Sequence, residues 1–185
     1  MGEVWLVRHG QTEWSMAGRH TSTTDLALTA DGKSIAQSLA SRLAEGSFEL
    51  VLSSPRVRAR RTAELAGFPA AEVDPDLVEW DYGDYEGVTT DEIRESVPGW
   101  TIWSHPCPGG ETAAEVSARL DRVVARCRGS SGDALLFGHG HCLRGLAARW
   151  LGLPVSEGRL LRLDTGTISF LGHEREDPVV LRWNS

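Results

Sequence analysis

The chain has 185 residues, 41% of them hydrophobic and 24% charged, which is the composition of one globular domain in water. Its formal net charge is −7, which argues against a nucleic-acid partner, because nucleic-acid phosphates attract basic surfaces. The sequence contains no apolar run of about 18 residues and no basic start followed by an apolar stretch, so we expect neither a membrane span nor a signal peptide.

The first strand and the first long helix follow from hydrophobic patterning. The run EVWLVR predicts a buried strand over residues 3–8. The stretch at 28–46 predicts a helix with Thr29 as its N-cap. Its apolar face would hold Ile35, Leu39 and Leu43.

A second strand and helix follow. FELVLSS predicts a strand over 48–54, and SPRVRARRTAELAG predicts a helix within 54–67. We expect Ser54 as the cap of this helix, Pro55 in its first turn and Gly67 at its end.

The second half repeats the alternation. The helix within 112–127 begins with a capping box of Thr112 and Glu115. Its apolar stripe comprises Val116, Leu120, Val123 and Val124. DALLFGHGH then predicts a strand running into a Gly-His turn. The following segments are a helix over 143–154, closed by Gly152 and Pro154, and short β segments within 159–172 and 178–183.

Strands that alternate with helices predict an α/β fold, a three-layer α/β/α sandwich with a mostly parallel sheet. No linker or repeat divides the chain, so we expect one domain over residues 1–185. Three predicted strands end in the turns Arg8-His9, Ser53-Ser54-Pro55 and Gly138-His139-Gly140. Because α/β sheets bind ligands beyond the carboxyl ends of their strands, these turns should meet around one crevice.

Two of these turns present histidines. A lone histidine here is commonly a hydrogen-bonded core residue, but Arg8 beside His9 weakens that interpretation, because a buried guanidinium needs an anion. Gly10 allows close approach of the backbone. His139 lies between two glycines, and the same argument applies to it.

Arginines and carboxylates supply further candidates. The helix after the second strand carries Arg56, Arg58, Arg60 and Arg61. Residues four apart share a helix face, so only one or two of these arginines would face the crevice. The stretch LVEWDYGDYEG contains Glu79, Asp81, Asp84 and Glu86. Glu79 lies between Val78 and Trp80, an apolar setting that suits a proton donor.

Arginines, histidines and one carboxyl group fit the hydrolysis of a phosphate monoester. Arginine binds phosphate oxygens bidentately. Histidine attacks phosphorus and holds the phosphoryl group, and a carboxylic acid protonates the leaving oxygen.

On these residues the chain resembles the histidine phosphatase superfamily, also called the phosphoglycerate-mutase-like family. The resemblance spans nearly the whole chain. Its blocks, in order, are LVRHGQTEW, DLALTADG, SSPRVRARRTA, LVEWDYGDYEG, PGGET and FGHGHCLR. The versions EWDYGDYEG, TIWSHPCPGGET and GHGHCLR look closest to bacterial acid phosphatases and to the sedoheptulose-1,7-bisphosphatase branch.

The resemblance implies a role for each matching residue. His9 matches the histidine that becomes phosphorylated, and Glu79 matches the proton donor and acceptor. Arg8 and Arg58 match the phosphate-binding arginines, and His139 matches the second pocket histidine. Further substrate contacts are implied for Gln11, Ser15, Thr21, Gly140 and His141.

The chain departs from the family pattern at three of these places. Ser15 stands where many members have Asn, and Thr21-Ser22 stands where mutases usually have Thr-Gly. Gly140-His141 follows His139 where many members have Gly-Gly.

The resemblance favours a metal-independent phosphomonoesterase without a cofactor, acting on small phosphorylated metabolites such as sugar phosphates. A phosphoglycerate mutase is the first alternative, but the segment from Tyr85 to Gly110 holds a single arginine, Arg94, where cofactor-dependent mutases carry a longer basic insertion. A non-catalytic phospholigand-binding module is the second alternative. Selectivity would reside in residues 86–108, which include Trp100, Trp103 and His105.

The expected partner is a small phosphate monoester, and neither nucleic acid nor a membrane. Cys107, Cys127 and Cys142 form neither a CxxC pair nor a zinc pattern, and free thiols suit a reducing compartment, so we expect a cytoplasmic protein. The oligomeric state stays open, with a homodimer among the arrangements.

Overall fold

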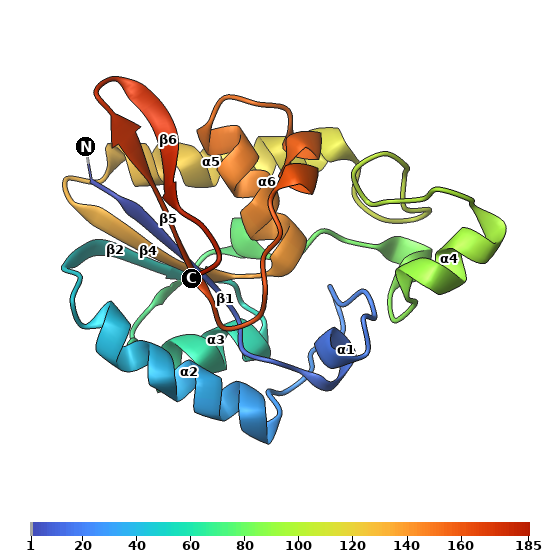
Figure 1. Cartoon of the computed structure of the whole chain (residues 1–185), viewed down its shortest axis with the longest axis horizontal. Helices are drawn as coiled ribbons and strands as arrows, with labels where there is room; N and C mark the ends of the chain where they lie inside the picture. The colour runs from blue at the N-terminus through green and yellow to red at the C-terminus, as the bar shows by residue number, and fades with distance from the viewer. Residues whose placement is uncertain (1) are drawn as a thin grey trace.

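A six-stranded sheet forms the centre of the computed structural model, which describes residues 2–185 (Figure 1). Its strands are β1 (Val4–Arg8), β2 (Phe48–Ser53), β3 (Glu72–Val73), β4 (Asp133–Gly138), β5 (Ile168–Glu174) and β6 (Asp177–Arg182). The order is β3-β2-β4-β1-β5-β6. The first four strands are parallel, β5 is antiparallel to β1, and β6 is antiparallel to β5. The sheet is therefore mostly parallel, as predicted.

Helices cover both faces of this sheet. The helices are α1 (Glu13–Met16), α2 (Ala30–Leu43), α3 (Val57–Leu65), α4 (Thr90–Ser96), α5 (Ala113–Gly129) and α6 (Gly140–Trp150). Three 3-10 segments add η1 (Pro75–Leu77), η2 (Gly83–Tyr85) and η3 (Val155–Leu160). Figure 1 shows α2 and α3 on one face, α5 and α6 on the other, and α1 and α4 beyond the end of the sheet.

Alternating side chains of the central strands build the two cores. Leu6 of β1 and Leu136 of β4 belong to the larger apolar cluster, with the residues of α5 and α6. Val7 and Phe137, the next residue in each strand, belong to the smaller cluster with α2 and α3. Successive strand residues point to opposite faces, and the three-layer α/β/α prediction is confirmed.

The predicted helix ends agree with the structure at several places. The Thr29 side chain accepts a hydrogen bond from the backbone of Gly32, and Thr112 forms the capping box at the start of α5. Gly67 and Gly152 follow helices with φ values of +98° and +74°. Glycine adopts this left-handed conformation without the strain that a side chain would add.

Two local predictions are wrong. Ser54 does not cap α3, because the N-cap is Arg56, without a side-chain hydrogen bond, and the Ser54 hydroxyl contacts His139 instead. Ile35 is 36% exposed, and Ala36 takes its place on the buried face of α2.

Several boundaries also differ from the predictions. The helix predicted from residue 143 begins at Gly140, directly after β4. The predicted β segment within 159–172 is a strand only from Ile168. The helix α4 was not predicted. Among residues 2–185, no helix combines the length and the apolar character needed to cross a membrane.

Candidate functional site

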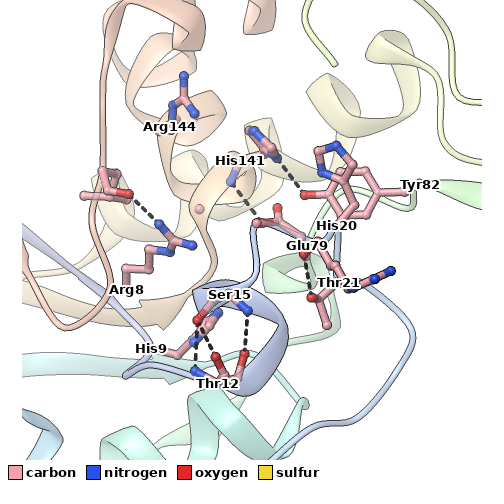
Figure 2. Close-up of a pocket in the computed structure, with 14 residues that line it drawn as sticks. Arg8, His9, Thr12, Ser15, His20, Thr21, Glu79, Tyr82, His141 and Arg144 are labelled. Carbon is pink, nitrogen blue, oxygen red and sulfur yellow. Dashed lines mark hydrogen bonds between the residues drawn. The ribbon is translucent and has the colours of Figure 1, made fainter. Parts of the chain in front are cut away.

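A cavity of about 170 Å³ lies where β1 and β4 end (Figure 2). Its lining includes seven of the ten candidate residues from the sequence: Arg8, His9, Ser15, Thr21, Glu79, Gly140 and His141. The strand-end crevice is therefore present. The other three candidates, Gln11, Arg58 and His139, do not line it.

His9 is held with its reactive nitrogen available. Its Nδ1 lies 2.7 Å from the carbonyl oxygen of Gly10, and because a carbonyl only accepts, Nδ1 carries the proton and Nε2 keeps its lone pair. Burial lowers the pKa of His9 well below 6.5, with Arg8 and Arg58 adding repulsion. The imidazole is therefore neutral at neutral pH, as a nucleophile must be.

Arg8 offers unused donors beside this ring. Its Nη1 donates to the carbonyl of Leu163 at 2.5 Å. Its buried Nε has no hydrogen-bond partner in the part of the chain that the structure describes. A Cβ at Gly140 would lie 3.2 Å from Cζ of Arg8, so glycine leaves room for the guanidinium at the start of α6. An anion in the cavity would satisfy the buried donor.

His139 lies beside His9, and both of its ring nitrogens form hydrogen bonds. The two ring centroids are 5.2 Å apart. Nδ1 of His139 accepts a hydrogen bond from Nε of Arg58 at 3.2 Å, so Nε2 carries the proton and donates to the Ser54 hydroxyl at 2.8 Å. Burial, followed by the charge of Arg58, lowers the pKa of His139 well below 6.5.

Arg58 is fully buried rather than part of the cavity wall. Besides His139, its guanidinium donates to the carbonyls of Thr21, Ser22 and Thr24 at 3.0, 3.3 and 3.0 Å. These contacts use four of the five N–H donors of an arginine. Arg58 thus connects the loop over the cavity to His139.

The carboxylate of Glu79 sits on the N-terminus of α6. Oε1 accepts from the backbone N–H groups of Trp80 and Cys142 at 2.9 and 2.7 Å, and Oε2 accepts from that of His141 at 3.0 Å. Two of these three donors belong to the first turn of α6. Glu79 is therefore oriented by α6, whose first residues also line the cavity.

A buried ion pair holds the loop that carries Glu79. Arg119 donates to both carboxylate oxygens of Glu111 at 2.8 and 2.9 Å. The same guanidinium donates to the carbonyls of Asp76 and Val78 at 2.8 and 2.9 Å. Glu111 in turn accepts from the backbone of Asp81 at 2.9 Å. The backbone is thus fixed on both sides of Glu79.

Three residues with predicted substrate contacts form hydrogen bonds within the protein. Gln11 lies outside the cavity, because its Oε1 accepts from the Thr29 hydroxyl at 3.0 Å. Ser15 lines the cavity, but its hydroxyl binds the backbone N–H and carbonyl of Thr12 at 2.9 and 3.0 Å. The hydroxyl of Thr21 donates to the carbonyl of Arg19 at 3.1 Å.

The other lining residues were not predicted: Thr12, Gly18, Arg19, His20, Tyr82, Arg144 and Leu163. Arg144 lies one helical turn after His141 on α6 and was within reach of a spacing argument, whereas Tyr82 and Glu79 lie outside the helices. His20 and Leu163 belong to loops without such a pattern. Within residues 2–185, no cluster of three or more His, Cys, Asp or Glu side chains could hold a metal ion.

The buried histidines predict how stability depends on pH. Burial lowers the pKa of His9, His20, His139 and His141, to about 4 for His20. In the unfolded chain each titrates near 6.5, so below that pH the unfolded state binds more protons. We expect full stability above about pH 6.5 and a loss of about 2 kcal/mol at pH 5 from His20 alone.

Denaturant unfolding at pH 7.5, 6 and 5 measures this loss. His20→Gln is the matched variant, because it removes one titrating ring and should flatten the dependence. A free energy of unfolding that stays constant from pH 7.5 to 5 would contradict the expectation.

Comparison with known proteins bears on the chemistry of this site. The family model described as "Histidine phosphatase superfamily (branch 1)" matches residues 4–185. An acid phosphatase of Mycobacterium tuberculosis is 44% identical over 173 residues, 91% of this chain and 85% of the relative. A sedoheptulose 1,7-bisphosphatase of Saccharomyces cerevisiae is 39% identical over 82% of this chain and 68% of its own length.

A solved structure shows the same fold. The product of an open reading frame of Mycobacterium tuberculosis superimposes with a TM-score of 0.95 at 41% identity. The match covers 99% of this chain and 97% of the other.

Proposed function

Because the chain belongs to the histidine phosphatase superfamily, we propose that it hydrolyses phosphate monoesters through a phosphohistidine on His9. One observation carries the proposal: a neutral imidazole with its Nε2 unprotonated shares a cavity with the donors of Arg8 and the carboxyl group of Glu79. Nucleophile, anion-binding group and proton donor are the components that such a hydrolysis needs.

The reaction has two steps. Nε2 of His9 attacks phosphorus, the ester P–O bond breaks, and protonated Glu79 gives its proton to the leaving alkoxide. Water then attacks the phosphohistidine while Glu79 takes a proton from it, the N–P bond breaks and inorganic phosphate leaves. Arg8 and the remaining donor of Arg58 stabilise the negative charge on phosphorus oxygens in both steps.

The proposed substrates are small phosphorylated metabolites such as sugar phosphates. A polar cavity of about 170 Å³ supports a small substrate rather than nucleic acid or a membrane surface. The names of the two relatives, an acid phosphatase and a sugar bisphosphatase, support the same class. Buried free thiols at Cys107, Cys127 and Cys142 support a cytoplasmic location.

A panel of phosphorylated metabolites tests the proposal. It includes 3-phosphoglycerate with its bisphosphate primer and is assayed for phosphate release in excess EDTA. We expect release of phosphate from sugar phosphates without added metal. Isomerisation of 3-phosphoglycerate without phosphate release would indicate a mutase, and binding without turnover would indicate a phospholigand-binding module. Activity restored only by Mg²⁺ or Zn²⁺ would contradict the metal-independent mechanism.

Arg58 should matter far more than its neighbours on α3. Arg58→Lys is expected to lower kcat/KM about 10²–10³-fold, because one ammonium cannot reach His139 and the backbone carbonyls together. Arg60→Lys is the matched control, since Arg60 is exposed on the same helix. Unfolding curves separate loss of activity from loss of fold, and equally small effects at both positions would contradict the assignment.

A further inference from the structure

A second cavity, the outer cavity, adjoins the inner cavity that contains His9. This outer cavity has a volume of about 350 Å³ and includes the rings of Trp100 and Trp103. Both cavities are lined by His20, His141 and Arg144. A substrate whose phosphate lies against His9 would therefore extend past these three side chains.

The ring of His141 is oriented by Tyr82 (Figure 2). The Tyr82 hydroxyl lies 2.6 Å from Nδ1 of His141. Burial raises the pKa of Tyr82 well above 10 and lowers that of His141 well below 6.5. Both groups are therefore neutral. In the Nε2–H tautomer of His141, the Tyr82 hydroxyl donates a hydrogen bond to Nδ1 and the ring keeps a free donor at Nε2.

Nε2 of His141 has no hydrogen-bond partner among residues 2–185. The backbone N–H of the same residue donates to Glu79 at 3.0 Å. His141 is therefore fixed at both its backbone and its ring, next to the group that protonates the leaving oxygen.

We propose that Tyr82 is a positioning residue that sets the tautomer of His141, whose Nε2–H recognises a hydroxyl oxygen of the leaving group close to the phosphoester. This inference rests on the proposed function and deepens it: the preferred substrates are phosphates of polyhydroxy alcohols. A neutral donor suits a hydroxyl oxygen, and a substrate without that hydroxyl leaves the donor unpaired.

Two alkyl phosphates of similar size test the proposal. Glycerol 1-phosphate carries hydroxyls beside the phosphoester, and propyl phosphate carries none. We expect the wild type to prefer glycerol 1-phosphate about tenfold in kcat/KM. His141→Phe should abolish the preference, and Tyr82→Phe should reduce it by at least about threefold. In the double variant, Tyr82→Phe should have no additional effect on the preference, because it acts through His141.

Tyr85→Phe is the matched control. Tyr85 packs its ring against Trp100 with centroids 5.3 Å apart, and within the described chain its hydroxyl has no hydrogen-bond partner. The same loss of one oxygen, three residues away, should leave the preference unchanged. Nitrogen-15 NMR of the imidazoles should show a single Nε2–H tautomer for His141, lost in Tyr82→Phe.

The outcomes separate this inference from the proposed function. If the wild type does not hydrolyse p-nitrophenyl phosphate, the proposed function fails and the inference with it. If it does hydrolyse that ester, two results overturn the inference alone: equal rates on the two alkyl phosphates, or a preference that survives both Tyr82→Phe and His141→Phe. An Nδ1–H tautomer of His141 in the wild type would also overturn it.

Discussion

His9→Ala is expected to lower turnover of p-nitrophenyl phosphate by more than about 10⁴-fold while the fold survives. The substitution removes the nitrogen that would form the bond to phosphorus. Arg8 and Glu79 would still bind and orient the ester, so affinity for inorganic phosphate should change far less than turnover. Steady-state phosphate release, phosphate binding and thermal unfolding measure the three quantities.

His105→Ala is the matched control for this prediction. His105 contacts Ser104 at 2.9 Å and lines neither the inner nor the outer cavity, so its loss should leave turnover close to that of the wild type. A well-folded His9→Ala variant that kept more than a few per cent of the activity would exclude His9 as the nucleophile.

Glu79→Gln is expected to slow hydrolysis of alkyl phosphates about 10²–10⁴-fold and that of p-nitrophenyl phosphate much less. An alkoxide leaves poorly without a proton, whereas nitrophenolate leaves readily. The glutamate also accepts three backbone hydrogen bonds, and an amide offers only one oxygen. Either His141 alone, or both Trp80 and Cys142, would lose the acceptor of a backbone N–H, so we also expect a loss of about 1–3 kcal/mol in stability.

Rates on both substrate types and trapping of the phosphorylated enzyme measure this effect. Phosphohistidine should persist longer in Glu79→Gln, because the same carboxylate would activate water in the second step. Equal losses on both substrates without a trapped intermediate would remove Glu79 from proton transfer. Asp81 and Asp84, the other carboxylates of the acidic block, line neither cavity, so the role would pass to another group.

The sequence predicts the sheet, its layers and the three strand-end turns, because these depend on local periodicity. Val7 and Phe137 belong to one core and the residues before them to the other. The continuous apolar runs that such strands need can be read directly from the sequence. Thr29 and Thr112 are visible in the same way, because a cap acts on residues within one helical turn.

Contacts between residues that lie far apart in the sequence could not be predicted from local patterns. Arg8 binds the carbonyl of Leu163, and Tyr82 binds His141 across 59 positions. Serine is a residue type that often caps a helix, but the Ser54 hydroxyl forms a hydrogen bond with His139. No local sequence pattern shows which group Ser54 binds, because its partner depends on how the strands and loops pack together.

Because β1 lies between β4 and β5 in the sheet, it can pair only after these later strands have been synthesised. Val4 pairs with Ala134 on one side and with Leu171 on the other, so a ribosome must add more than a hundred residues before the strand carrying His9 has a neighbour. Such non-local pairing slows folding and leaves an apolar N-terminal strand exposed to chaperones and to aggregation. His9, the proposed nucleophile, is thus made long before the strands that pair with β1. A nascent chain that stops before Leu163 lacks the carbonyl that holds Arg8.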